Sequence, residues 1–179
     1  MLFTHFGISG PVALQISLAV VDALDKGPVS VAIDLKPDIT HGELRNELQG
    51  AFNRFGKRTC RNVLGNLIPE KMVVPLIELA GVSPDKRGHE ITAGERDSLV
   101  DLIKCLRFDI KCPLSMEAAM VTAGGVSLKE INPSTMASRI VKGLFFCGEV
   151  MDIDADTGGY NLQAAFSSGY IAGENAAKF

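Results

Sequence analysis

A block of helical sequence, residues 38–106, interrupts a chain that otherwise follows the period of strands. Two capping boxes mark helix starts within the block, Thr40 with Glu43 and Thr92 with Glu95. Apolar residues recur at helical spacing after each box. The first series is Leu44, Leu48, Phe52 and Phe55, and the last is Leu99, Leu102, Ile103 and Leu106. The block therefore predicts a small helical subdomain inserted between strands.

Strand-like segments flank this block on both sides. Residues 27–37 alternate apolar and polar side chains between two prolines, and the strand period returns at 107–112 and 118–128. The segment "GLFFCGEV" (143–150) is an apolar run with glycine at each side, and a helix-like segment follows it. An apolar strand followed by a helix is typical of a parallel sheet. The sequence predicts an α/β fold of mixed α+β character.

The first residues add a strand and a helix to this scheme. Residues 2–6 resemble a short strand, and Pro11 suits the first turn of a helix. Apolar residues of the segment 11–25 indicate that this helix is mostly buried.

Composition excludes several classes of function. The chain has 179 residues, a formal net charge of -3 and no Trp, so nothing favours nucleic acid or an anionic membrane surface as a partner. No stretch of 18 apolar residues predicts a membrane span. A basic cluster, Arg54, Lys57, Arg58 and Arg61, is interpreted as a solvated helix face.

The four cysteines and three histidines carry no recognisable metal or redox motif. Cys60, Cys105, Cys112 and Cys147 form no CxxC pair, and no metal-ligand spacing surrounds the histidines. We expect reduced core thiols in a cytoplasmic protein. A thiol-redox role for Cys105, Cys112 or Cys147 is a weaker alternative, and burial of Cys147 in its apolar strand would keep that thiol inert.

The end of the chain combines acid, glycine and small side chains. Asp152, Asp154 and Asp156 have the spacing of a calcium loop, but Thr157 and Gln163 occupy its glycine and glutamate places. Calcium is therefore rejected, and no metal is expected. The aspartates would also repel a phosphate dianion at the following helix start. The backbone N–H groups of "GGYNLQ" better match a carbonyl edge that gains charge in a reaction.

The helix after the glycine pair lacks bulk on one face. Its small residues lie three or four positions apart, a spacing that allows close approach to a sheet or to a flat ligand. They are Ala165, Gly169, Ala172, Gly173 and Ala176. Tight helix–sheet packing alone explains most stripes of this kind.

Two sequence segments and their order carry a family resemblance. The segments "LFTHFGISGP" and "VTAGGVSLKEINPSTMASRIVKGLFFCGEVMDIDADTGGYNLQAAFSSGYIAG", in this order, resemble the aminoacetone-oxidase-like (BaiN-type) family of NAD(P)/FAD-dependent oxidoreductases. The helical middle agrees with that family in position and character. In such flavoproteins the FAD-binding Rossmann-like domain is discontinuous, and the last strand and helix of the chain complete it.

The resemblance assigns roles near the flavin. It implies that residues 143–150 form the closing strand and that the amides after Asp156 face the pyrimidine edge of the isoalloxazine. It also implies a glycine loop close to the flavin. The cofactor-binding residues implied are Thr122, Gly124, Gly125, Gly148, Glu149, Gly158, Gly159, Tyr160, Asn161 and Leu162. Catalytic residues are unknown, and His5 and Glu149 are candidates only as possible proton-handling groups.

The chain contains no GxGxxG motif, the feature that binds the FAD pyrophosphate. The resemblance thus predicts the C-terminal portion of a flavoprotein, with a Rossmann half in a missing N-terminal segment as its partner. The expected order is the end of an inserted β-rich domain at 1–37, the helical subdomain at 38–106, returning strands and a crossover at 107–142, and the closing FAD-domain elements at 143–179.

Two hypotheses of function follow from the resemblance. In the first, the chain is part of an FAD-dependent oxidoreductase in which NAD(P)H reduces the flavin and a small molecule is the substrate. In the second, it is a non-catalytic fragment or interaction module that binds no flavin alone. An unpaired strand at 143–150 would also present an exposed sheet edge, through which a homodimer could form.

Overall fold

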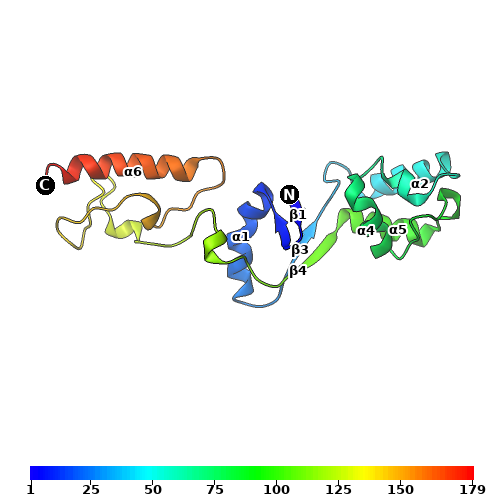
Figure 1. Cartoon of the computed structure of the whole chain (residues 1–179), viewed down its shortest axis with the longest axis horizontal. Helices are drawn as coiled ribbons and strands as arrows, with labels where there is room; N and C mark the ends of the chain where they lie inside the picture. The colour runs from blue at the N-terminus through cyan, green and yellow to red at the C-terminus, as the bar shows by residue number, and fades with distance from the viewer. The chain divides into compact units, whose positions relative to one another are not determined.

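The structure of the chain is a computed structural model that describes residues 1–179, and it divides into two compact units (Figure 1). Unit 1 comprises residues 1–29 and 111–179, and unit 2 comprises residues 30–110. Helices and strands are both present, so the mixed α/β prediction is confirmed.

Unit 2 is a helical bundle whose two strands pair with each other. Its helices are α2 (His41–Arg54), α3 (Cys60–Leu64), α4 (Glu70–Leu79) and α5 (Ala93–Lys104), with a 3₁₀ turn η1 (Gly88–Glu90). Strand β3 (Val29–Ile33) pairs with β4 (Leu106–Ile110). Both predicted capping boxes are confirmed, because Thr40 and Thr92 each exchange hydrogen bonds with the glutamate three residues later.

The core of unit 2 is built from the apolar series that the sequence marked. Leu44 and Leu48 of α2 and Leu99 and Ile103 of α5 are fully buried. Side chains of this type each contribute about 1.5–3 kcal/mol when removed from water. The rest of the buried cluster comprises Phe52, Cys60, Val63, Leu64, Ile68, Val73, Leu76, Ile77, Val82, Val100 and Leu106.

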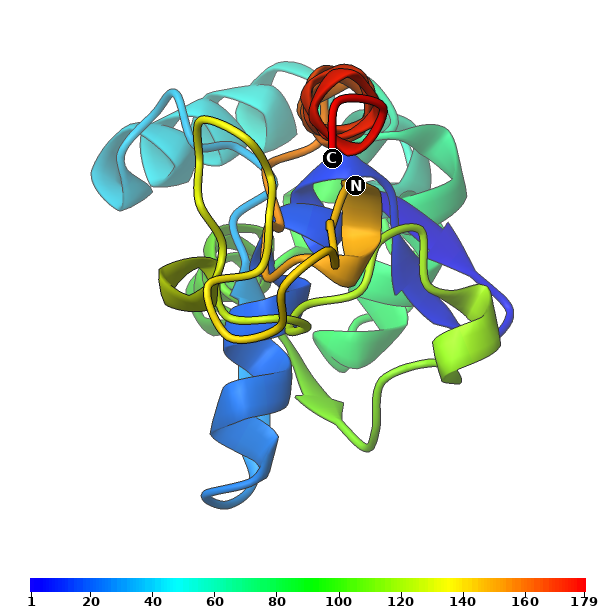
Figure 2. The same ribbon diagram turned by 90° about the vertical axis from the view of Figure 1, so that its left-hand side faces the viewer.

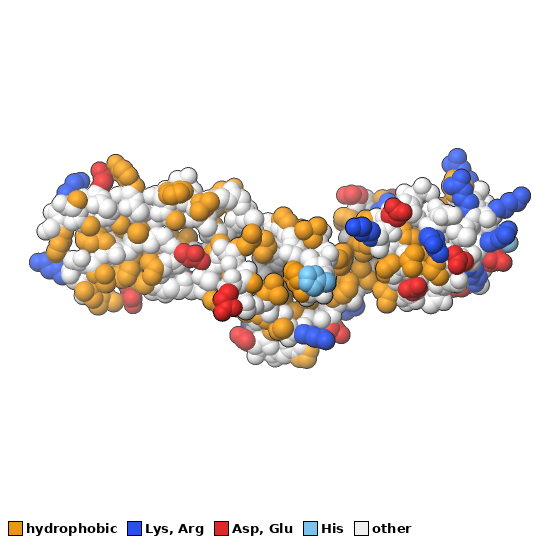
Figure 3. Space-filling view, in the orientation of Figure 1, with side chains coloured by type: hydrophobic (Ala, Val, Ile, Leu, Met, Phe, Trp, Pro, Cys, Tyr) orange, Lys and Arg blue, Asp and Glu red, His pale blue; other side chains and the backbone are white.

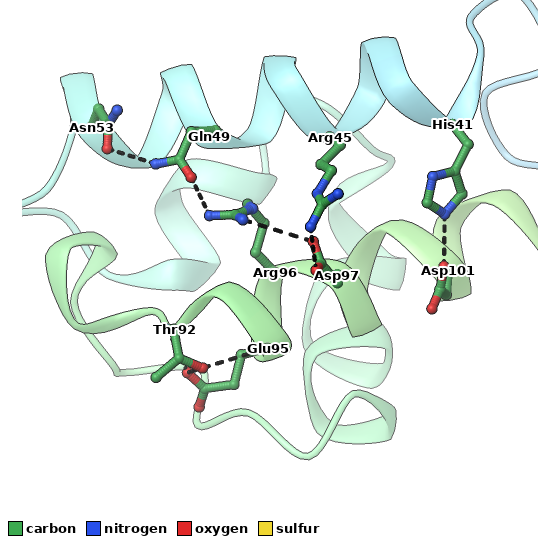
Figure 4. A network of polar contacts seen from close by, with 9 residues as sticks. All are labelled: His41, Arg45, Gln49, Asn53, Thr92, Glu95, Arg96, Asp97 and Asp101. Carbon is green, nitrogen blue, oxygen red and sulfur yellow. Dashed lines mark hydrogen bonds and ion pairs between the residues drawn. The ribbon is translucent and has the colours of Figure 1, made fainter.

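Helices α2 and α5 run antiparallel, and polar contacts join them along their length (Figure 4). His41 lies 2.7 Å from Asp101 at one end. Arg45 forms an ion pair of 2.6 Å with Asp97. Arg96 donates to Gln49 near the other end. These contacts fix the position of α2 along α5.

Unit 1 contains little regular structure besides two helices. Its elements are the antiparallel hairpin β1 (Leu2–Thr4) and β2 (Gly7–Ser9), helix α1 (Pro11–Leu24), three 3₁₀ turns and helix α6 (Tyr160–Ala176). The turns are η2 (Met116–Ala118), η3 (Leu128–Glu130) and η4 (Gly148–Val150). Isolated bridges, among them Val126 with Met151, join the segments between the turns.

Two strand predictions for unit 1 are wrong. Residues 143–150 form no strand, since only Phe145 makes a bridge and a 3₁₀ turn begins at Gly148. Residues 118–128 also form no strand and carry only the bridge at Val126. An extended segment becomes a strand only where a neighbour pairs with its N–H and C=O groups, and these segments lack one along most of their length. The homodimer through a strand edge stays a prediction.

Helix α1 forms over the predicted range, but none of its residues is buried. Val12, Leu14 and Leu18 are instead exposed. Leu79 is the only large hydrophobic side chain of unit 2 with comparable exposure, so exposed apolar surface concentrates in unit 1 (Figure 3). No helix combines the length and the apolar character that crossing a bilayer requires.

The prediction of core thiols holds for one cysteine only. Cys60 is buried, and this burial raises the pKa of its thiol to about 11. Cys105, Cys112 and Cys147 are exposed free thiols. The expectation that Cys147 is buried in an apolar strand is wrong, because that strand does not form.

Candidate functional site

Thr122 and Glu149 are joined directly, although 27 residues separate them in sequence. Glu149 Oε1 accepts a hydrogen bond of 2.7 Å from the Thr122 backbone N–H and one of 2.8 Å from its hydroxyl. These two bonds, the backbone one first, lower the pKa of the Glu149 carboxyl below its ordinary value. Glu149 is therefore a carboxylate at neutral pH, which fits a positioning group better than a proton donor.

At Gly125 the backbone lies close against that of Val150 and Met151. Its φ is +132°, and a Cβ there would lie 2.5 Å from the carbonyl oxygen of Val150. The approach allows Val126 to form its parallel bridge, in which its N–H donates to Val150 O at 2.9 Å. Only glycine combines this backbone conformation with this contact. Gly124, also with positive φ, precedes it and has open space around it.

Gly148 connects this region to helix α6. Its N–H donates to Ser168 Oγ at 3.0 Å, and Ser168 in turn donates to the carbonyl oxygen of Ala164 at 2.7 Å. Ser168 is the one buried polar residue of the chain. Figure 2 looks along α6 and shows η4 beside it, in agreement with the contacts between the two elements.

Helix α6 begins at the predicted glycine pair. Gly158 and Gly159 both have positive φ, and Gly159 is the N-cap residue in the left-handed conformation. No side chain caps the helix, so its first N–H groups have no partner within it. Tyr160 and Leu162 flank these groups, and each is 64% exposed. An electropositive helix start with exposed apolar side chains results.

Asn161 has a structural role as well as its place in the first turn. Its side-chain amide donates to Ala155 O and accepts from Ala155 N–H, each at 2.8 Å. This pair of bonds closes the loop 155–161. Asp152, Asp154 and Asp156 are exposed, and no group of three or more His, Cys, Asp and Glu residues could hold a metal ion.

The structure thus brings the predicted residues together in two groups. The first contains Thr122, Gly124, Gly125, Gly148 and Glu149, and the second runs from Gly158 to Leu162. Ser168 is the contact of the first group on α6, seven residues after Asn161, which corresponds to about 10 Å along a helix. His5 belongs to neither group; its ring lies edge-on to Phe6.

Sequence reasoning missed Ser168. It also grouped small residues of α6 on one packing face, although some of them are exposed. Ala172 is buried and Ala165 is partly buried, but Gly173 and Ala176 are exposed. The signal for Ser168 was available, because it is a hydroxyl residue on the same helical face as Ala165 and Ala172.

Comparison with known proteins places this chain in a family. The family model described as "HI0933-like protein barrel and H2TH domain" matches residues 1–121. The chain belongs to the HI0933-like family. The match supports the predicted relationship in its coarser form, an HI0933-like family, and it ends before the two groups of candidate residues.

Curated relatives extend the similarity through α6. A 3-dehydro-bile acid delta(4,6)-reductase of Clostridium scindens is 31% identical over 179 residues, 99% of this chain and 44% of the relative. A ribosomal RNA dihydrouridine synthase of Haemophilus influenzae is 38% identical over 95% of this chain and 40% of its own length. The corresponding enzyme of Escherichia coli is 33% identical over 98% of this chain. The chain therefore spans less than half the length of these relatives.

Proposed function

We propose that this chain is the C-terminal part of an FAD-dependent oxidoreductase and supplies the contacts on the isoalloxazine side of the cofactor. Its similarity to a bile acid reductase and to two dihydrouridine synthases supports a reductive reaction. The observation that carries the proposal is the uncapped start of α6, where free amides lie beside exposed Tyr160 and Leu162.

The residues at this helix start fit the edge of a flavin ring. Flavin carbonyl groups accept hydrogen bonds, and the amides of Gly159 to Leu162 are donors without side-chain partners. Glycine at positions 158 and 159 adds no Cβ atom beside these amides, and the space next to Gly159 is open, whereas the Tyr160 ring lies against Gly158. Tyr160 and Leu162 offer apolar surface for a flat ring system.

The first group of residues has a supporting role in this proposal. The two hydrogen bonds from Thr122 to Glu149 fix the loop 122–125 against η4, and Gly148 fixes η4 against α6. The loop is thereby held at a constant distance from the helix that binds the ring. Bound FAD supplies the electron transfer, with NAD(P)H as the proposed donor.

We further propose that a polypeptide segment carrying the Rossmann half covers the apolar surface of unit 1. Val12, Leu14, Phe166 and Tyr170 are exposed, although residues of these types are usually buried in a complete domain. The relatives have more than half of their length outside the matched region, which is enough for such a segment. The chain alone is then a non-catalytic fragment that binds flavin weakly or not at all.

The test is complementation with a relative. The chain, purified alone with FAD, is expected to remain colourless after gel filtration. Added to the part of the Haemophilus influenzae relative that it does not match, it is expected to form a yellow complex. A colourless mixture in which the two polypeptides associate would refute the flavin role.

A pair of glycine variants on one helix locates the flavin contact. Gly159→Asp places a negative charge at the free amides, at a positive φ that strains any side chain but that aspartate adopts more often than most residues. We expect this variant to lower the flavin content of the complex. Gly173→Asp adds the same charge at an exposed position of α6 with open space around it, and serves as the control. Equal flavin content in both variants would contradict the placement.

A further inference from the structure

A shallow hollow of about 570 Å³ lies at the end of α2 in unit 2. Its lining is basic and aromatic and contains no carboxylate. It consists of Asn53, Arg54, Phe55, Gly56, Lys57, Arg58 and His89. Figure 3 shows Lys and Arg side chains gathered at this end of the helical unit. None of the residues with a proposed flavin contact takes part in it.

The three cations of the hollow have no acidic partner. Arg54, Lys57 and Arg58 are exposed and form no ion pair, whereas the neighbouring Arg61 is neutralised by Asp85 at 2.8 Å. Glu90, the residue after His89, forms no ion pair with these cations, and its carboxylate accepts a hydrogen bond from the Arg87 backbone N–H. Three positive charges within five residues therefore remain available to an anion.

Phe55 arranges two of these charges. The guanidinium carbon atoms of Arg54 and Arg58 lie 5.1 and 4.8 Å from the centre of its ring. Such cation–π contacts hold the planar guanidinium groups in place without neutralising them. Planar guanidinium groups bind phosphate oxygens in pairs and stack on bases.

The backbone under the hollow is fixed by η1. The His89 N–H donates to Gly56 O at 3.1 Å, and the His89 ring Nδ1 lies 2.6 Å from the same oxygen. The Gly88 N–H donates to Arg58 O at 2.9 Å, and Gly88 itself is buried against Phe52 and Gly56. The backbone that carries the cations is thus held by hydrogen bonds to η1 and is not a frayed helix end.

We propose that this hollow binds the sugar-phosphate backbone of RNA. Unpaired cations on a fixed, open surface match the regular charge of a nucleic-acid strand, and the ring and guanidinium planes suit unstacked bases. The choice of RNA rests on the proposed function, because two of the related reductive enzymes are named for ribosomal RNA. The site would hold the RNA in unit 2 while unit 1 carries the flavin.

The whole-chain charge of -3 favoured no nucleic-acid partner, but it hides an uneven distribution. Between Asn53 and Arg61 the sequence has four basic residues and no acidic one. The interpretation of this cluster as a solvated helix face left out Phe55, which was assigned to an apolar series, and His89, which only the folded chain brings next to the cluster. Local charge, rather than net charge, determines where a polyanion binds.

Salt dependence of RNA binding tests the proposal with the full chain. Fluorescently labelled fragments of ribosomal RNA are titrated with wild-type protein and with the triple variant Arg54→Gln, Lys57→Gln, Arg58→Gln. Three phosphate contacts correspond to about a twentyfold to fortyfold loss of affinity between 50 and 200 mM salt. The variant is expected to bind about tenfold more weakly at low salt, with the slope of log affinity against log salt shallower by about 2.

A matched control removes the same charge from unit 1. Lys26→Gln, Lys111→Gln and Lys129→Gln alter exposed residues without ion pairs, and we expect the salt slope to stay near that of wild type. Circular dichroism verifies that both triple variants keep their helix content. Equal weakening by the two sets would mean nonspecific attraction and would overturn the proposal.

Two other outcomes also overturn it. One is wild-type protein that fails to bind the RNA fragments, and the other is binding of polyglutamate in place of RNA, which would make the partner an acidic protein. The flavin complementation assay is measured separately with the same triple variant. Loss of RNA binding with unchanged flavin content supports this site, whereas a colourless complex with intact RNA binding refutes the flavin proposal alone.

Discussion

Replacement of Glu95 by glutamine should destabilise unit 2 in a manner that depends on pH. Glu95 closes the capping box of α5 and also accepts hydrogen bonds of 2.7 and 2.8 Å from the Lys86 ammonium group. Lys86 belongs to the loop that precedes η1, so this ion pair ties that loop to α5. Glutamine can still close a capping box, and the substitution therefore isolates the charge.

The magnitude follows from the pKa of the Glu95 carboxyl. Lys86, and then the Thr92 backbone N–H, lower this pKa from 4.5 to about 2. A shift of this size corresponds to at most about 3–4 kcal/mol of stability at neutral pH. The Glu95 side chain is 23% exposed and its Lys86 partner 28%, and solvent screens such a pair. We expect a loss of about 1–2 kcal/mol in the free energy of unfolding.

The sign of the pH dependence distinguishes charge from packing. Because the folded pKa is depressed, the contribution of Glu95 is fully present above pH 4.5 and is lost as the pH falls toward about 2. Urea unfolding followed by circular dichroism measures the difference between wild type and Glu95→Gln at pH 7 and near pH 2. The difference should be full at pH 7 and small near pH 2.

Glu43→Gln provides the matched control, since Glu43 closes the other capping box without an ion pair. Its pKa is also lowered, chiefly by the Thr40 backbone N–H. We expect a smaller loss of stability than for Glu95→Gln. An equal loss in the Glu95 variant at both pH values would refute the role of the charge, as would equal losses in the two variants at pH 7.

Two further outcomes are expected from the same chain. Gly125→Ala should break the bridge between Val126 and Met151, because its Cβ would lie 2.5 Å from a carbonyl oxygen. Hydrogen exchange should then accelerate at the Val126 amide, and unchanged exchange would count against the close approach. Under native conditions Cys60 should resist alkylation while the three exposed thiols react, since burial raises the Cys60 pKa to about 11. Mass spectrometry of labelled peptides identifies the reacting cysteines.

The helical part of the fold could be predicted because its signals are local. Thr40 with Glu43 and Thr92 with Glu95 fix where α2 and α5 begin, and each helix presents its apolar series within a few turns. These residues meet partners from the same unit, so periodicity also gave the buried face correctly. Strands β3 and β4 were also predicted correctly, because each has its pairing partner, the other strand, within this chain.

Unit 1 could not be predicted to the same extent, because its apolar runs lack partners within the chain. The run at 143–147 and the helix α1 both have the hydrophobicity of buried elements, yet Leu144 and Leu14 are exposed. The glycine positions were predictable, since Gly125 and Gly159 adopt conformations that other residues avoid. The hydrogen bonds between Thr122 and Glu149 could not be predicted, because no local pattern indicates a contact across 27 residues.

The different surfaces of the two units bear on how the proposed activities divide between them. Unit 2 buries its apolar residues in a core of its own and presents unpaired cations, so its free surface suits a polyanion. Unit 1 leaves Leu162, Phe166 and Tyr170 exposed along one side of α6, so its surface suits apolar partners such as a flavin ring or another domain. The proposed RNA site and the proposed flavin contact therefore lie on different units and use different surface chemistry. Substitution of the unit 2 cations should therefore leave the α6 surface of unit 1 unchanged, and the reverse should also hold.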